Sequence, residues 1–171
     1  MNAIAGLILF ASSLFGPPRP EQTHTRVLSV DIVMDSGDQP LGAYQVEFTV
    51  ARDGSKPPRV MAVEGGEAAA FAASPRYDAK AVRGGRLILA GFSLEAEENL
   101  PKGRTRVARV HLRVEGPGPQ PTATARAMVA GNGRAERIEA SAEATVAADV
   151  TGTIGRADHD GWGKARIDRP R

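Results

Sequence analysis

The stretch that decides the fold is residues 26–50, which read RVLSVDIVMDSGDQPLGAYQVEFTV. Apolar and polar side chains alternate in its first part, and the alternation returns after the polar segment DSGDQP. A period of two places one face of a β-strand inward and the other outward, and Asp, Ser, Gly and Pro favour a turn. The stretch therefore predicts two consecutive strands. The side chains expected in the core are Leu28, Val30, Ile32, Met34, Tyr44, Val46, Phe48 and Val50.

The same kind of pattern recurs along the chain. RVMAVEGG (59–66) indicates a short third strand, and in RTRVARVHLRVE (104–115) the side chains of Arg109, His111 and Arg113 are expected to face outward. Alternate residues of the latter, Ala108, Val110, Leu112 and Val114, are expected to face the core. Further strands are expected in GRLILAGFSLE (85–95), TATARAMVA (122–130) and RIEASAEATVA (137–147).

Several local features make more detailed predictions. The nearly continuous apolar run in 85–95 favours a strand buried on both faces, and Asn132-Gly133 favours a tight hairpin turn. Segment 67–83 is less regular: EAAAFAA favours one or two helical turns, followed by an irregular connection across one end of the fold. One face of the last strand is expected to carry Ile138, Ala140, Ala142, Ala144 and Val146.

Together these patterns predict the fold class. Seven or more short strands separated by turn-rich loops, with at most one short helix, are typical of an all-β antiparallel two-sheet sandwich. Because no helices alternate with the strands, parallel α/β folds and their nucleotide sites are disfavoured. The length of 171 residues, 42% of them hydrophobic, suits one domain with an ordinary core.

The two ends differ in composition from the middle. AIAGLILFASSLFG (3–16) is an uncharged apolar run, shorter than the about 20 residues of a bilayer span but typical of a signal peptide, with small residues that place cleavage after Ser13. The alternative is a buried helix or strand of the domain. The predicted organisation is residues 1–16 as signal peptide or short membrane anchor, 17–25 as linker, 26–149 as the sandwich and 150–171 as a disordered basic tail.

Composition and spacing disfavour several kinds of chemistry. The chain has no cysteine, and its net charge of +2 offers no concentrated basic face for nucleic acid. His111 is expected to be an ordinary surface residue apart from His24 and His159, no G-x-S-x-G is present, and Asp158 and Asp160 make only a fragment of a calcium loop. We therefore expect no catalytic residues, no metal site and no cofactor.

Two aromatic residues in the irregular connection, Phe71 and Tyr77, are the candidate ligand-binding residues. Sugar-binding proteins use exposed aromatic faces, so a carbohydrate-binding function requires these two side chains to be exposed and coplanar. The alternative for Phe71, which stands among alanines, is a structural role: its side chain would close one end of the sandwich.

Longer segments resemble a known family. LSVDIVMDSGDQPLGAYQVEFTV (28–50) resembles the opening hairpin of cohesin-like domains, while GGRLILAGFSLE (84–95) and GRTRVARVHLRVEG (103–116) resemble their central pair of strands. The resemblance covers about residues 27–148. It implies a jelly-roll sandwich of about nine strands, related in fold to family 3 carbohydrate-binding modules, and binding of a protein through one sheet face, as cohesins bind dockerins.

The sequence thus leads to one expectation and two alternatives for function. We expect an exported, non-enzymatic cohesin-like module, secreted or in the periplasm or cell envelope, that binds a dockerin-like or other protein partner. A carbohydrate-binding module that uses Phe71 and Tyr77 to bind a polysaccharide is the first alternative. The second is a structural envelope protein that contacts the membrane only through an uncleaved N-terminal segment.

Overall fold

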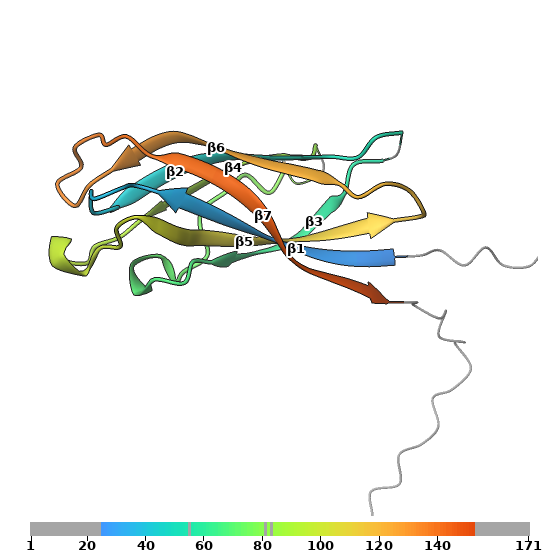
Figure 1. Ribbon diagram of the computed structural model, residues 1–171, viewed down its shortest axis with the longest axis horizontal. Coiled ribbons are helices and arrows are strands. Elements are labelled where there is room, and N and C mark those ends of the chain that lie inside the picture. The colour runs from blue at the N-terminus through green and yellow to red at the C-terminus, as the bar shows by residue number, and fades with distance from the viewer. Residues whose placement is uncertain (1–24, 55, 81, 83, 153–171) are drawn as a thin grey trace, which may run out of the picture.

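The computed structural model describes residues 25–54, 56–80, 82 and 84–152, and in them the chain forms a two-layer β-sandwich (Figure 1). The strands are β1 (Thr25–Asp35), β2 (Ala43–Ala51), β3 (Arg59–Gly65), β4 (Arg86–Phe92), β5 (Arg104–Glu115), β6 (Thr122–Gly131) and β7 (Ser141–Gly152).

All strand pairs are antiparallel, in a four-stranded sheet of order β3-β5-β1-β7 and a three-stranded sheet of order β4-β2-β6. The predicted fold class is confirmed. The described residues hold seven strands rather than about nine, and an isolated bridge between Arg76 and Ala90 adds one pairing at the outer edge of β4.

The core lies between the two sheets, as the alternation predicted. All eight side chains predicted to face inward in residues 26–50 are buried, and so are the four predicted in β5. A β-bulge at Val107 in β5 adds one more apolar side chain to the core, because Val107 and Ala108 are both fully buried. Because β1 and β2 are interior strands of their sheets, their buried side chains supply the middle of the core.

The prediction for β4 was wrong in one respect. This strand is the edge of the three-stranded sheet and is not buried on both faces. Leu87 and Leu89 point into the core, whereas Phe92 on the outer face is 66% exposed. A run of apolar residues has the same appearance in a strand covered on both faces and in an edge strand whose outer face is apolar, so the sequence could not separate the two.

The turn after β6 forms, but the strands around it do not make a simple hairpin. The Oδ1 atom of Asn132 accepts hydrogen bonds from the backbone N–H groups of Arg134 and Glu136, and the positive φ of 61° falls at Ala135 instead of Gly133. Gly131 pairs with Arg137, after which the chain crosses to the other sheet and begins β7. The turn residues were therefore identified correctly, whereas the predicted tight Asn-Gly turn was wrong.

The predicted inner face of β7 is correct for most of its length. Ile138, Ala140, Ala142 and Ala144 pack against the core, but Val146 is 51% exposed. A bulge in the β1–β7 ladder falls between Ser29 and Val30, next to Val146, and β7 is the edge strand of the wider sheet. The narrower facing sheet does not cover Val146.

The helical prediction for segment 67–83 reduces to a single 3₁₀ turn, η1 (Ala69–Phe71), and a second one, η3 (Glu97–Asn99), lies after β4. No helix within the described ranges is long and apolar enough to span a membrane. Strand structure extends from Thr25 to Gly152, slightly beyond the predicted 26–149. The predictions for residues 1–24 and 153–171 lie outside the described residues.

A buried arginine holds the loop between β5 and β6. Arg52 is 7% exposed, and its guanidinium donates hydrogen bonds to three carbonyl oxygens: Nη1 to Glu115 at 2.7 Å, Nη2 to Gly116 at 3.1 Å and Nε to Pro119 at 3.0 Å. Hydrogen bonds from a charged donor are stronger than neutral ones. Arg52, directly after β2, thus fixes the start of the loop that leads from β5 in one sheet to β6 in the other.

Replacing Arg52 by methionine removes these donors and keeps an apolar side chain of similar length. Because a hydrogen bond to a charged group contributes about 1.5–3 kcal/mol and such losses do not add fully, we expect the free energy of unfolding to fall by about 3 kcal/mol. Urea unfolding should show a lower midpoint at an unchanged slope. Arg59→Met, at an exposed position of β3, is the matched control and should change stability by less than about 0.5 kcal/mol. Equal midpoints for the two variants contradict the anchoring role.

Candidate binding surfaces

The outer face of the three-stranded sheet is the first candidate surface, and we call it the binding face. Strand register places its side chains in rows across β4, β2 and β6. From one end to the other the rows are Arg86–Thr49–Thr124, Ile88–Glu47–Arg126, Ala90–Gln45–Val129 and Phe92–Ala43–Gly131. The face is therefore polar at one end and apolar at the other.

The polar end of the binding face is organised by one carboxylate. Glu47 Oε1 lies 2.5 Å from Nε of Arg86, and Glu47 Oε2 lies 2.6 Å from Nη2 of Arg126. The hydrogen bond from Arg126, followed by that from Arg86, lowers the pKa of the Glu47 carboxyl below its ordinary value. Next to them the hydroxyls of Thr49 and Thr124 are 2.6 Å apart. These side chains hold one another in place on an otherwise open surface.

The apolar end of the binding face exposes large side chains. Phe92 on β4 is 66% exposed and Val129 on β6 is 46% exposed, with the small residues Ala43 and Gly131 completing the row of Phe92. Just beyond β4, Leu94 is 92% exposed. Single exposed apolar residues are normal on soluble proteins, whereas several at one end of a sheet face are typical of an interaction surface.

A cleft of about 260 Å³ lies beside Phe92, between β4 and the segment that follows η1. Its floor is made by Tyr44 and Phe71, whose rings meet edge to face with centroids 5.2 Å apart. Burial raises the pKa of the Tyr44 hydroxyl, which donates a hydrogen bond to the carbonyl of Val107 at 3.0 Å. Gly91 leaves room for this ring, since a Cβ there would lie 2.6 Å from it.

The two predicted ligand-binding residues do not form an exposed pair. Phe71 is only 4% exposed, because it packs on Tyr44 and closes that end of the sandwich, as its alternative interpretation proposed. Tyr77 is 37% exposed and does not line the cleft. The more exposed aromatic residue of this region is Phe92, which the sequence interpretation missed. In the sequence Phe92 is marked only as an apolar residue at the end of a predicted strand. Its exposure could be predicted only if that strand were known to lie at the edge of a sheet.

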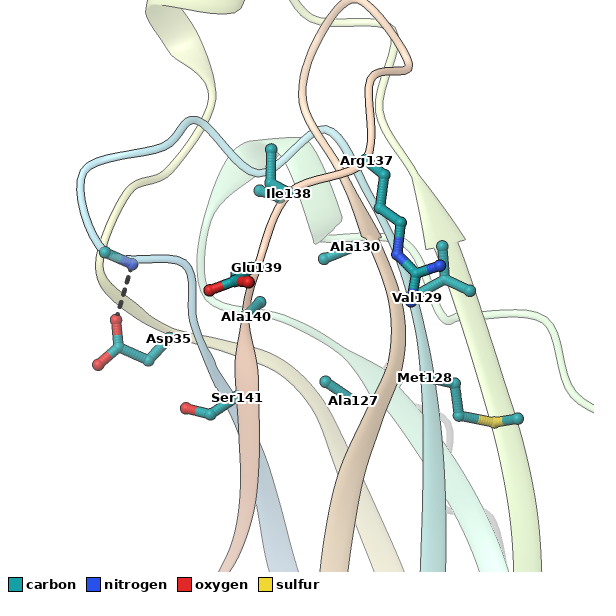
Figure 2. A pocket seen from close by; sticks show the side chains of 11 residues that line it. Asp35, Ala127, Met128, Val129, Ala130, Arg137, Ile138, Glu139, Ala140 and Ser141 are labelled. Atoms are coloured by element: carbon teal, nitrogen blue, oxygen red, sulfur yellow. Dashed lines mark hydrogen bonds between the residues drawn. The ribbon is translucent and has the colours of Figure 1, made fainter.

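A larger hollow, which we call the side groove, lies where the chain crosses from β6 to β7 (Figure 2). Its volume is about 770 Å³, in the range of ligand pockets. Figure 2 shows the short side chains of Ala127, Ala130 and Ala140 around it, with Arg137 lying beside Val129. The remaining lining residues are Asp35, Gly37, Met128, Ile138, Glu139 and Ser141.

The opposite face of the sandwich, on the four-stranded sheet, is covered by paired polar side chains. Asp31 accepts hydrogen bonds from Nε and Nη2 of Arg109 at 2.6 and 3.0 Å. His111 faces outward as predicted; its Nδ1 lies 3.0 Å from Ser29 Oγ and its Nε2 2.9 Å from Glu64 Oε1. Ser29, His111 and Glu64 line neither the cleft nor the side groove, so neither hollow could hold a substrate against this row.

Among the residues that the structure describes, no group of three or more His, Cys, Asp or Glu side chains is placed to hold a metal ion. His24, His159 and the pair Asp158 and Asp160 lie outside the described residues.

Comparison with known proteins identifies no family: no family model, no curated protein and no solved structure was found to match this chain.

The titration of Glu47 tests the geometry of the binding face. We expect carbon-13 NMR to show the Glu47 carboxyl titrating below its ordinary value of 4.5. Arg126→Gln should raise this pKa more than Arg86→Gln, because the hydrogen bond from Arg126 is its largest cause.

The sign of the effect on stability follows from the direction of the shift. A lowered pKa in the folded state favours folding above the ordinary carboxyl pKa, and this contribution is lost as the pH falls through the lower, folded value. Thr124→Ala, in the next row, is the control and keeps both arginines. An unshifted titration in the wild-type protein contradicts the ion-pair geometry.

Proposed function

We propose that this protein is an exported, non-catalytic binding module of the cohesin-like kind, which engages a protein partner through the apolar end of the binding face. The observation that carries the proposal is the exposure of Phe92 with Val129 and Leu94 at one end of an otherwise polar sheet face. The resemblance of residues 27–148 to cohesin-like domains supports a partner that binds to a sheet face.

The choice between the two sheet faces rests on their different desolvation costs. Ion pairs such as Asp31–Arg109 cover the four-stranded sheet, and burying them against a partner carries a large desolvation penalty. The apolar end of the binding face releases free energy when it is buried, at about 25 cal/mol per Å² of apolar surface. Aromatic residues, phenylalanine among them, are enriched in the buried centres of protein interfaces. The binding face is therefore the better docking surface.

The cleft beside Phe92 adds shape to this surface. Phe92 lines it, together with the pair Tyr44 and Phe71 and with Gly91. A partner side chain that enters the cleft would contact Phe92 there. This arrangement suits a protein partner with one protruding apolar side chain.

Replacement of Phe92 by glutamate tests the proposal. The full chain, immobilised, is exposed to the envelope fraction and medium of the producing cell together with a panel of insoluble polysaccharides. We expect one protein to be captured in stoichiometric amount, and Phe92→Glu to weaken this capture tenfold or more, since losing a central interface aromatic costs about 2 kcal/mol. Stability should change by less than about 0.5 kcal/mol, because the side chain is exposed.

Met61→Glu is the matched control, because Met61 is 57% exposed on β3 of the other sheet. It should bind the partner like the wild-type protein. Capture that Met61→Glu abolishes and Phe92→Glu leaves intact would move the interface to the four-stranded sheet. Retention on a polysaccharide that is lost in Tyr77→Ala, with no protein captured, overturns the proposal in favour of carbohydrate binding.

A further inference from the structure

Two arginines border the apolar end of the binding face, one beyond each edge of the three-stranded sheet. Arg76, in the segment after η1, pairs with Ala90 at the outer edge of β4. Arg137, after the turn that follows β6, pairs with Gly131. Residues opposite each other in an antiparallel pair point to the same face of a sheet, and Ala90 and Gly131 belong to rows of the binding face. The side chains of Arg76 and Arg137 therefore lie on this face.

The surroundings of the two arginines agree with this placement. Figure 2 shows Arg137 beside Val129, and Arg76 lines the cleft together with Phe92. Both arginines are exposed. Among the described residues no carboxylate forms an ion pair with either guanidinium. Their charges can thus meet those of a docking partner without breaking an ion pair described here.

The outer faces of the two sheets differ in formal charge. The binding face, with the two segments that border it, holds four guanidinium groups and one carboxylate, an excess of three positive charges: Arg76, Arg86, Arg126, Arg137 and Glu47. On the outer face of the four-stranded sheet, strand register places five groups of each sign: Arg59, Arg104, Arg106, Arg109 and Arg113 with Asp31, Asp35, Glu64, Glu115 and Glu143. Because opposite charges steer and align the two partners of an interface, the binding face suits an acidic partner.

We propose that the partner is an acidic protein that presents an apolar side chain with a carboxylate on each side of it. The apolar side chain packs on Phe92 and enters the cleft, while Arg76 and Arg137 each receive one aspartate or glutamate. Arginine can hold a carboxylate through two parallel N–H···O hydrogen bonds, so these pairs fix the orientation of the partner. The inference rests on the proposed function, which supplies the protein partner, and adds the chemistry by which that partner is recognised.

The separation of the two arginines favours a protein over a small anion. Across the sheet they are four strand spacings apart, because β4, β2 and β6 lie between their segments. Neighbouring strands are about 4.8 Å apart, and the two arginines stand in rows two residues apart, so their backbones are about 20 Å from each other. Phe92 and Val129 lie between them. A single phosphate or sugar acid does not join both arginines across this apolar surface, whereas a helix of about 13 residues spans the distance.

Selection of peptides on the immobilised full chain tests the inference with a defined probe, a phage library that displays random 16-residue peptides. We expect the enriched peptides to carry Asp or Glu on both sides of an aromatic or aliphatic residue. Their dissociation constants, measured by fluorescence anisotropy, should rise about threefold in Arg76→Gln and in Arg137→Gln, as for other exposed ion pairs. The two changes together should raise them about tenfold, because the sites are too far apart to couple.

A matched control separates the binding face from net charge. Arg59 and Arg113 are opposite each other on the four-stranded sheet, and Arg59→Gln with Arg113→Gln removes the same charge and should leave the dissociation constants unchanged. Arg76→Glu with Arg137→Glu should reverse the preference, so that it binds a peptide whose acidic residues are replaced by lysine better than the original. Circular dichroism of each variant shows that the sandwich is intact.

A neutral change at Phe92 separates failure of this inference from failure of the proposed function. Phe92→Ala removes the ring without adding charge, and it should weaken peptide binding tenfold or more. Binding that Phe92→Ala weakens, but that Arg76→Gln with Arg137→Gln leaves unchanged, overturns the acidic partner and leaves the proposed function standing. Binding that Phe92→Ala leaves intact counts against both.

Two further results overturn the inference. One is equal affinity for a single-stranded oligonucleotide, since the face would then recognise negative charge alone. The other is a library from which no peptide is enriched, because a peptide of this length can present the required groups. Capture of one protein by the chain and its loss in Phe92→Glu would, in either case, still support the proposed function.

Discussion

Burial of the inner faces of β1 and β2 is the interaction on which the rest of the structure depends. Each of these strands is central in its sheet: β1 is paired with β5 and β7, and β2 with β4 and β6. Their inward side chains form one continuous core with those of β5. Because a shift of one residue would turn every one of these side chains outward, the core also fixes the register that aligns the rows of the binding face.

The unequal width of the two sheets explains most of the surface. Four strands cannot be covered completely by three, so Val146 on β7 stays half exposed and a gap lined by alanines opens along β6 and β7. At the other edge of the narrow sheet, the described residues pair with β4 only through the bridge between Arg76 and Ala90, and the outer face of β4 presents Phe92. The candidate surfaces are thus consequences of how the edges of the sandwich are covered.

Local periodicity was enough to predict the strands, the buried residues of β1, β2 and β5, and the fold class. It could not predict which strands lie at the edges, because β1 pairs with β7 more than one hundred residues away and no short-range pattern records that choice. This explains the errors on β4 and on Val146. It also explains why the sequence left two interpretations open for Phe71, which is a core residue, and why Phe92, which was expected in a buried run, is exposed.

The two outer faces show how the same strand pattern can give surfaces of different chemical character. Outward positions of β5 carry arginines that form ion pairs within that face, as Arg109 does with Asp31 on β1, so much of the charge there is already paired. On the binding face the ion pairs stop at the row of Glu47, and the rows beyond it contain only Ala90, Gln45, Val129, Phe92, Ala43 and Gly131. A partner that docks there gains apolar contact at Phe92 and can align on the fixed guanidinium groups of Arg86 and Arg126, so affinity and orientation come from different ends of one sheet face.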